Sequence, residues 1–367
     1  MKKFCYCAAL LLALVLGHYE GFAQATNSTQ TPPSTPQSET EKAFQQGLQQ
    51  FKDQQWEPAA QSFRRVLALQ PGNAVANYNL GLCLYRQKKY SDAITPFREA
   101  TRLNPTYYEA HLQLGNALDM SKQYIEAVES YKKAAQIRPN ENGPYYEMGV
   151  AHGSQKKYTE AVEAYRQSLQ RSPSHASSHL NLGLILRQMD RDDEALAEFQ
   201  EVIKLTPTTA TPHKELGEIY LKRKQFDEAR KYYTEALRLQ PDYADAQLGI
   251  GNSYFNDSKY TEAMDAYRKT VQMAPKSVTA NLYLADAYRL LKRYDEAAAS
   301  YQEALKLDAK IVDAHYYLGL LHIVRNDPAS AMREYNLLVP LNAAKAEKLL
   351  EKIPVSARTA GAPVSQK

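Results

Sequence analysis

Residues 142–175 read NGPYYEMGVAHGSQKKYTEAVEAYRQSLQRSPSH, and the chain returns to this pattern every 34 residues. Four positions of the unit recur in phase, and here they are a glycine, an alanine, an aromatic residue and a proline: Gly149, Ala161, Tyr165 and Pro173. Self-similarity at a period of 20 to 50 residues is typical of repeat architectures, in which each unit is one supersecondary element. The fold is therefore set by a unit that is copied along the chain.

The four columns run through nine units that together cover residues 40–345. The proline column is Pro71, Pro105, Pro139, Pro173, Pro207, Pro241 and Pro275. The glycine column is Gly47, Gly81, Gly115, Gly149, Gly183, Gly217 and Gly251, followed by Ala285 and Gly319. The alanine column is Ala59, Ala93, Ala127, Ala161, Ala195, Ala229, Ala263, Ala297 and Ala331. The aromatic column is Phe63, Phe97, Tyr131, Tyr165, Phe199, Tyr233, Tyr267, Tyr301 and Tyr335.

Each column has a physical reason that predicts a pair of helices. The first half of a unit reads as a helix, as in ANYNLGLCLYR at Ala76–Arg86. The glycine and the alanine stand where a neighbouring helix approaches too closely for a larger side chain, and the aromatic residue one turn later fills the space between helices. Proline closes the unit because it cannot continue a helix. No run alternates with a period of two, so the sequence predicts an all-α fold without strands.

This arrangement resembles the tetratricopeptide repeat (TPR), a helix–turn–helix unit of 34 residues with small, small, aromatic and proline positions in this order. The resemblance implies a right-handed superhelical solenoid of nine stacked repeats. Terminal repeats of such arrays are expected to be atypical, because one of their faces meets solvent. The departures from the pattern cluster at the ends of the array: Gln46, Ala309, Pro328 and Ala343.

After the ninth unit the sequence predicts a capping helix. Asn342 is placed to cap its N-terminus, and residues 346–353 form its end. One apolar face follows helical spacing: Ala346, Leu349, Leu350 and Ile353. We expect this helix to cover the last repeat; an amphipathic helix that binds a partner is the alternative.

The N-terminal 1–25 segment reads as a signal peptide. Two lysines precede the apolar run Ala8–Gly17, and an A-x-A cleavage pattern ends at Ala25. An apolar run of this length is too short to span a bilayer, which needs about 20 residues. We therefore expect an exported chain, periplasmic or secreted, with no transmembrane segment once it is cleaved. Residues 26–39 read as a flexible Ser/Thr/Pro/Gln-rich linker and residues 354–367 as a disordered tail.

Composition and motifs argue against catalysis and against cofactor or metal binding. The excess of 45 basic over 41 acidic residues indicates no nucleic-acid role. No phosphate-binding, nucleotide-binding or zinc-protease motif is present in the sequence. His175 and His179 are four residues apart, but no third or fourth ligand accompanies them, and a zinc site usually needs at least three. Cys83, the only cysteine beyond the signal segment, falls on a helix face that we expect to be buried.

The resemblance implies that the first helices line a concave groove, with the fifth, ninth and twelfth places of each unit pointing into it. These columns are more apolar and aromatic than a solvated surface requires, which indicates a protein or peptide partner. Of these side chains, Asn116 and Asn252 suit a peptide backbone and Arg187 and Arg289 suit carboxylates. The alternative is that part of these columns packs between repeats. The predicted groove residues are Tyr78, Leu82, Tyr85, Leu112, Asn116, Tyr146, Leu180, Arg187, Leu248, Asn252, Phe255, Leu282 and Arg289.

The function expected from this reading is a non-enzymatic scaffold in the assembly of an envelope, pilus or secretion complex. An accessory subunit of polysaccharide synthesis or export, with a glycan as partner, is the alternative. The clamp by which some family members grip a terminal carboxylate is not reproduced, because Lys214 is followed by Glu218 where the clamp has asparagine. A basic edge at the turn between the helices is a second candidate surface: Lys88, Lys89, Lys122, Lys156, Lys157, Arg191, Lys224, Lys259, Lys292 and Arg293.

Overall fold

A computed structural model describes residues 38–358. This part of the chain forms twenty helices and contains no strand, as the sequence predicts. The predicted signal peptide and all but the last two residues of the predicted linker lie outside the described residues. Within the described part, no helix combines the length and the apolar character needed to cross a membrane.

The chain divides into two compact units, of which the first comprises residues 1–105. Its described part holds the first two repeats as two helix pairs: α2 (Glu39–Lys52), α3 (Trp56–Leu69), α4 (Ala74–Arg86) and α5 (Tyr90–Leu103). Phe63 and Cys83 are fully buried together in its core, which confirms the expected burial of the cysteine. Burial raises the pKa of the Cys83 thiol to about 12, so the thiol stays protonated and unreactive.

The second unit comprises residues 106–367 and holds the other seven repeats. In each repeat a first helix is followed after a short turn by a second helix. Two further helices follow the last repeat. The helices are α6 (Tyr108–Met120), α7 (Tyr124–Ile137), α8 (Gly143–Ser154), α9 (Tyr158–Arg171), α10 (Ala176–Gln188), α11 (Asp192–Leu205), α12 (Ala210–Lys222), α13 (Phe226–Leu239), α14 (Ala244–Asn256), α15 (Tyr260–Met273), α16 (Val278–Leu290), α17 (Tyr294–Leu307), α18 (Val312–Val324), α19 (Pro328–Leu338), α20 (Ala343–Leu350) and α21 (Val355–Arg358).

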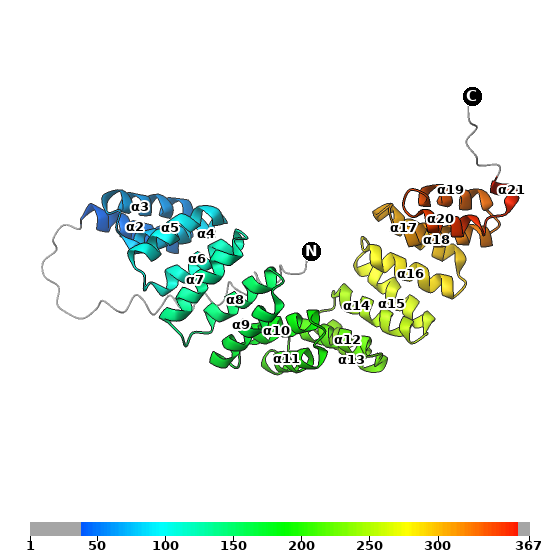
Figure 1. Ribbon diagram of the computed structural model, residues 1–367, viewed down its shortest axis with the longest axis horizontal. Helices are drawn as coiled ribbons and strands as arrows, with labels where there is room; N and C mark the ends of the chain where they lie inside the picture. The colour runs from blue at the N-terminus through cyan, green and yellow to red at the C-terminus, as the bar shows by residue number, and fades with distance from the viewer. Residues whose placement is uncertain (1–37, 359–367) are drawn as a thin grey trace, which may run out of the picture. The chain divides into compact units, whose positions relative to one another are not determined.

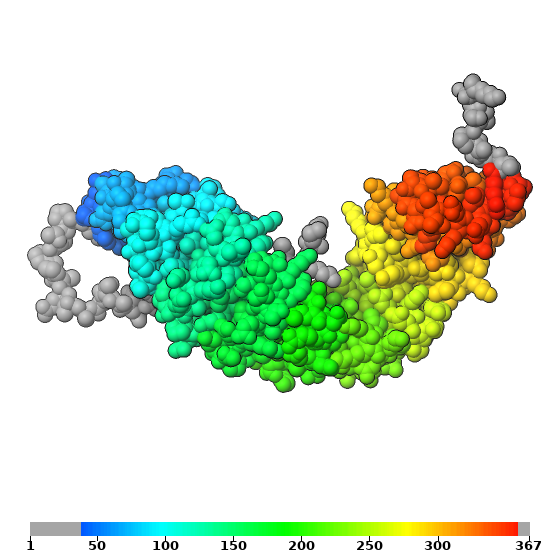
Figure 2. Space-filling view, in the orientation of Figure 1, coloured from blue at the N-terminus to red at the C-terminus, as the bar shows by residue number. Residues whose placement is uncertain are grey.

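Within the second unit the helix pairs stack in chain order (Figure 1). Each second helix packs against the first helix of its own repeat and against the first helix of the next. Successive first helices also touch, as α6 and α8 or α12 and α14 do, whereas successive second helices stay farther apart. First helices therefore line the inner side of the curved stack in the second unit. Figure 2 shows the outer surface of this unit as a continuous layer of atoms.

The glycine column is explained by the aromatic ring of the same repeat. A Cβ added to Gly149 in α8 would lie 2.5 Å from Cε1 of Tyr165 in α9. In the seventh repeat, a Cβ on Gly251 would lie 2.4 Å from the ring of Tyr267. Real Cβ atoms do not approach other atoms so closely, so glycine lets the second helix place its ring directly against the first. The eighth repeat has Ala285 in this column and still buries Tyr301. The predicted packing role of these columns is confirmed.

Each turn between the helices of a repeat is closed by a residue in the left-handed region. Lys156 has φ 60°, its N–H donates to Gly153 O over 2.9 Å, and the next N–H, of Lys157, reaches back to His152 O over 3.0 Å. This is a Schellman motif, in which glycine is the usual residue. Nine such residues recur at the 34-residue period, and none is glycine: Gln54, Lys88, Lys122, Lys156, Asp190, Lys224, Ser258, Lys292 and Asn326.

The proline column forms the turn that leads to the next repeat. His175 N–H donates to Ser172 O over 3.1 Å, so the chain makes a four-residue turn with Pro173 in its second position. Proline favours that position because its ring fixes φ near the value that the turn needs. The predicted role of proline as the end of the unit is confirmed.

The capping helix is α20, and it completes the last repeat. Asn342 Oδ1 accepts a hydrogen bond from Lys345 N–H over 2.9 Å, as expected of a helix cap. Leu349 is fully buried, and one of its methyl carbons would lie 2.5 Å from a Cβ on Gly319. Leu349 thus takes the place that the aromatic ring of the same repeat has elsewhere, and Tyr335 is only partly buried.

The end of the chain differs from the expected boundaries. Helix α20 ends at Leu350, three residues before Ile353, although Ile353 is buried as predicted. Within the predicted tail, Val355–Arg358 form the short helix α21. The Arg358 guanidinium explains this order, because it donates to the carbonyls of Ile353 and Glu351 and so satisfies the end of the preceding segment. Residues 359–367 lie outside the described part.

Candidate functional site

The predicted groove residues all lie on first helices, and all but one of them are partly exposed. The exception is Leu82, which is 6% exposed and belongs to the core of the first unit. In that unit Tyr78 packs against Phe97 with ring centroids 5.9 Å apart. Tyr85 meets Tyr90 edge-on at 5.1 Å. Both tyrosines thus hold the two helices of their repeat together and present only part of each ring to solvent.

The apolar groove residues of the second unit likewise pack against neighbouring helices and are partly exposed to solvent. Tyr146 lies against the core formed by repeats four to six, and its hydroxyl accepts a hydrogen bond from Asn181 over 3.2 Å. Five leucine or phenylalanine side chains are likewise half-buried between neighbouring repeats: Leu112, Leu180, Leu248, Phe255 and Leu282. Packing between repeats, the alternative left open by the sequence, therefore accounts for part of each column.

The two predicted asparagines are bonded to buried tyrosines of their own repeats. Tyr131 OH donates to Asn116 Oδ1, and Tyr267 OH donates to Asn252 Oδ1, each over 2.9 Å. A tyrosine hydroxyl buried without a partner would cost about 1–3 kcal/mol, so these bonds matter to the fold. They also leave the amide NH₂ group of each asparagine facing away from the tyrosine, because the oxygen is already taken.

The ninth place of a repeat follows the identity of its buried aromatic residue. Where the aromatic is phenylalanine, the ninth place is leucine: Leu48, Leu82 and Leu184 occur in the repeats of Phe63, Phe97 and Phe199. Where it is tyrosine, the ninth place is usually an acceptor: Asn116, Glu218, Asn252 and Asp286. Asp286 accepts from Tyr301 over 2.6 Å. Val150 and Leu320 are the two departures from this rule. The correlation is visible in the sequence, but only once the contact between the two positions is known.

Arg187 and Lys214, two cations of the groove columns, form ion pairs within the chain. The Arg187 guanidinium pairs with the Glu215 carboxylate on the next first helix. Lys214 is buried, and its ammonium lies 3.3 Å from Glu215 and 3.5 Å from Glu218. These four side chains compensate each other, because buried charges are costly unless they are paired.

Arg289 is held in the same way in the eighth repeat. Its guanidinium lies 3.1 Å from Asp286 and donates to Tyr301 OH over 3.3 Å. Its Cζ stacks 4.3 Å from the ring centroid of Tyr317, which lies on the next first helix. The predicted role of Arg187 and Arg289, to pair with a partner's carboxylates, would thus require them to leave carboxylates of their own chain.

Two carboxylates on the same face have no such compensation within residues 38–358. Asp119 is the twelfth residue of the third repeat, and its Oδ1 is buried without a hydrogen-bond partner. Burial raises the pKa of Asp119 to about 6. Burial, and then the neighbouring Asp119 charge, raise the pKa of Glu147 in α8 to about 8. Two acids that face each other with raised pKa values are held partly protonated at neutral pH.

The most exposed apolar side chains on the first helices lie at places that the sequence reasoning did not select. Tyr283 is the sixth residue of its repeat and Leu290 the thirteenth, and they are 37% and 38% exposed. Met120 and Val324, also in the thirteenth place, are 48% and 60% exposed. Places six, nine and thirteen share one helix face, since they are three and four residues apart. The accessible face is therefore rotated by about one residue from the predicted columns.

A shallow pocket of about 560 Å³ lies on the seventh repeat, at the start of α14 and the end of α15. Leu248, one of the predicted residues, lines it together with Thr270 and Pro275. The pocket is open to solvent and its lining is mainly apolar, so it suits one apolar side chain of a partner.

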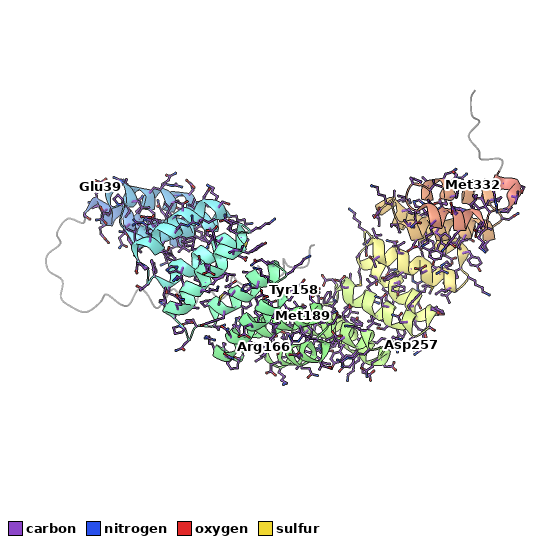
Figure 3. All side chains as sticks on the ribbon, viewed as in Figure 1. Glu39, Tyr158, Arg166, Met189, Asp257 and Met332 are labelled. Atoms are coloured by element: carbon purple, nitrogen blue, oxygen red, sulfur yellow. The ribbon has the colours of Figure 1, made fainter. Side chains whose placement is uncertain are left out.

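The basic edge is largely a feature of the turns themselves. Its lysines at positions 88, 122, 156, 224 and 292 are the left-handed residues that end the first helices. Several others are ion-paired: Arg191 with Glu194, Arg293 with Glu296, and Lys259 with Asp257, which is labelled in Figure 3. Exposed pairs of this kind contribute at most about 1 kcal/mol, and their cations are already compensated.

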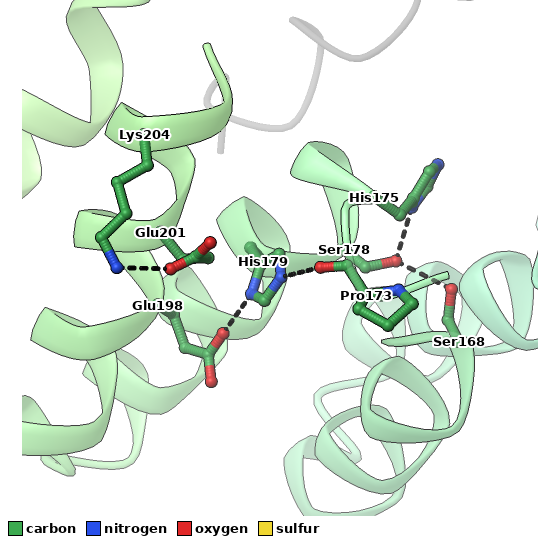
Figure 4. A network of polar contacts seen from close by, with 8 residues as sticks. All are labelled: Ser168, Pro173, His175, Ser178, His179, Glu198, Glu201 and Lys204. Atoms are coloured by element: carbon green, nitrogen blue, oxygen red, sulfur yellow. Dashed lines mark hydrogen bonds and ion pairs between the residues drawn. The ribbon is translucent and has the colours of Figure 1, made fainter. Parts of the chain in front are cut away.

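His175 and His179 face different partners and do not converge on one point (Figure 4). His175 Nδ1 lies 2.7 Å from Ser178 Oγ, and burial lowers the pKa of His175. His179 Nδ1 lies 2.6 Å from Glu198 Oε2, and its Nε2 lies 2.8 Å from the Pro173 carbonyl. These two acceptors, the carboxylate foremost, raise the pKa of His179. Both side chains thus make hydrogen-bonded links within the fold.

Comparison with known proteins agrees with this architecture. The sequence matches the family described as "Tetratricopeptide repeat" over residues 44–108, 146–210 and 214–278, and related repeat descriptions over 108–141 and 285–323. A search of the curated proteins gives no match.

Two of the solved structures with a similar fold show the extent of the likeness. The C-terminal part of a TPR repeat-containing protein from Cytophaga hutchinsonii is 17% identical, with a TM-score of 0.57 over 66% of this chain and 100% of that chain. PilF from Pseudomonas aeruginosa is 17% identical, with a TM-score of 0.51 over 57% of this chain and 97% of that chain. At these identities the likeness shows the fold alone.

Proposed function

Because the chain belongs to the tetratricopeptide repeat family, we propose that it is a non-enzymatic scaffold that binds a protein or peptide partner along its first helices. The proposal places the scaffold in the exported compartment, periplasmic or secreted, on account of the signal peptide that the sequence predicts at 1–25. Assembly of an envelope, pilus or secretion complex is the role that it suggests.

The observation that carries the proposal is the face made by places six, nine and thirteen in the second unit. Tyr283, Leu290 and Met120 leave apolar surface exposed there, between polar groups such as the Asn252 amide. Exposed apolar surface with a few oriented polar groups is typical of surfaces that bind proteins. The backbone N–H and C=O groups of an extended peptide have no partners within the peptide. The NH₂ group of Asn252 can donate a hydrogen bond to such a carbonyl.

Affinity capture with matched variants tests this proposal. The purified chain serves as bait for an extract of the exported compartment of the producing organism. A face variant carries Tyr283→Ala and Leu290→Ala. A control variant carries Ile125→Ala and Leu337→Ala, which lie on second helices and are 71% and 52% exposed. Proteins that bind the wild type and the control but are lost with the face variant support the proposal.

Two outcomes would contradict it. Equal recovery of the same proteins by all three baits would show that the partner binds elsewhere on the chain. Recovery of glycans in place of proteins would favour the polysaccharide role. Circular dichroism of each bait checks that the variants are still folded, as expected of substitutions at exposed apolar positions. A loss of binding then cannot be ascribed to unfolding.

A further inference from the structure

On the first helices of the second unit, carboxylates outnumber cations at the places considered for the groove. Places five, six, nine and twelve of repeats three to nine carry three cations and five carboxylates: Arg187, Lys214, Arg289, Asp119, Glu147, Glu215, Glu218 and Asp286. Each of the three cations is paired with a carboxylate on the same face. The two carboxylates left over are Asp119 and Glu147, in adjacent repeats.

The register between repeats brings these two acids together. The twelfth place of one repeat meets the sixth place of the next, as the pairing of Arg187 with Glu215 shows. The stacking of Arg289 on Tyr317, also a twelfth and a sixth place, repeats the relationship. In both cases an arginine occupies the twelfth place. Asp119 stands where those arginines stand, so Glu147 meets a second acid in place of a cation.

The described part of the chain supplies no partner for this pair. Asp119 Oδ1 is buried and accepts no hydrogen bond, and within residues 38–358 neither acid has an ion pair. A buried acceptor without a donor costs about 1–3 kcal/mol, more if it is charged, and native structures seldom leave one unless it has a role. Beside the pair, Met120 is 48% exposed and offers apolar surface.

We propose that Asp119 and Glu147 receive a lysine or arginine side chain of the partner. The proposal rests on the proposed function, since the cation belongs to the same bound segment. Its ammonium or guanidinium would pair with the carboxylates of Asp119 and Glu147, as the Arg187 guanidinium pairs with Glu215 two repeats later. Its apolar stem would lie on Met120, because long cationic side chains bury their methylene groups along apolar surface.

A randomised twelve-residue peptide display library tests the proposal on three purified baits. The first is the wild-type chain. The second carries Asp119→Asn and Glu147→Gln, which remove the charges and keep the shapes. The third is a control with the same charge change on second helices, Glu228→Gln and Glu262→Gln, both exposed.

We expect peptides selected by the wild type and the control to share a lysine or arginine at one position, and peptides selected by the double variant to lack it. One selected peptide should bind the double variant at least about tenfold more weakly than the wild type. Replacing its basic residue with methionine should weaken binding to the wild type by a similar factor and leave binding to the double variant unchanged.

Selected peptides with no basic preference, or with equal affinity for all three baits, would overturn this inference and leave the proposed function standing. A library that yields no binder on any bait would contradict peptide binding on this face altogether, and the basic-residue site with it. The two failures are therefore distinguishable in one experiment.

Discussion

Gly149 in α8 and Tyr165 in α9 make the close helix–helix contact that recurs in most of the repeats. A Cβ on Gly149 would lie 2.5 Å from Tyr165 Cε1, and the ring itself is only 3% exposed. The same contact is made in the other repeats that have this glycine, except the last, where Leu349 of the capping helix takes the place of the ring. One close approach between two helices, copied at a 34-residue step, thus produces the fold.

Replacing Gly149 with alanine should destabilise the second unit by about 1–3 kcal/mol, because the ring of Tyr165 must move or the helices must separate. Urea unfolding followed by circular dichroism measures this as a lower midpoint. Gly72→Ala is the control, since nothing lies within 4 Å of a Cβ at that position. Similar midpoints for the two variants would show that the packing assigned to Gly149 is incorrect.

The left-handed turn residues predict a stabilising substitution. Lys156 has φ 60°, a conformation that costs an ordinary residue on the order of 1 kcal/mol and glycine almost nothing. Lys156→Gly should therefore raise the free energy of unfolding by up to about 1 kcal/mol. Lys157→Gly, next in sequence but at φ −82°, should lower it, because glycine there only adds freedom to the unfolded chain. The two variants moving in the same direction would refute this explanation.

The bond between Tyr267 and Asn252 predicts a coupled pair of mutations. Tyr267→Phe should cost about 1 kcal/mol, because the Asn252 oxygen loses its donor over 2.9 Å. Adding Asn252→Leu should restore much of this stability, since the combination of phenylalanine and leucine is the natural pairing in three other repeats. A double-mutant cycle in urea gives the coupling energy directly. Additive effects of the two mutations would mean that the residues do not act as a pair.

The acid pair predicts how stability changes with pH. Burial raises the pKa of Asp119 to about 6 and that of Glu147 to about 8, from ordinary values of 3.8 and 4.5. A group whose pKa is higher in the folded chain stabilises fully below its unfolded pKa, and this stability is lost as the pH rises through the folded pKa. Between about pH 4 and pH 8 the wild type should therefore lose on the order of 1–3 kcal/mol more than the Asp119→Asn, Glu147→Gln variant.

Thermal unfolding of both proteins across this pH range checks the sign. At pH 8 the variant should melt at a higher temperature than the wild type, and at pH 4 the difference should shrink. The exposed control pair, Glu228→Gln and Glu262→Gln, should show no such trend. A variant that is less stable than the wild type at pH 8 would mean that the two acids are stabilised in the fold when ionised.

The columns of the sequence predicted the helix pairs, their turns and the buried faces, because these depend on contacts within one repeat that periodicity reports directly. The contacts of Arg187 with Glu215 and of Arg289 with Tyr317 were not predicted, because they depend on how the twelfth place of one repeat meets the sixth place of the next. Exposure of Tyr283 and Leu290 depends on the same rotation between repeats.

The lysines of the turns show a different limit of the sequence. Their regular spacing suggested a charged surface, whereas Lys156 and its equivalents are set by the backbone conformation that ends a helix. A glycine at this position would have predicted a left-handed backbone conformation from the sequence, whereas a lysine gives no such signal.

Site-specific photo-crosslinking in the producing cell tests the central claim most directly. A benzophenone amino acid replaces Tyr283 on the first helix α16 in one strain and Ile125 on the second helix α7 in another. The account predicts that the probe at 283 crosslinks to a defined protein and that the probe at 125 does not. Crosslinking of that protein at 125 and not at 283 would contradict the assignment of the binding face to the first helices.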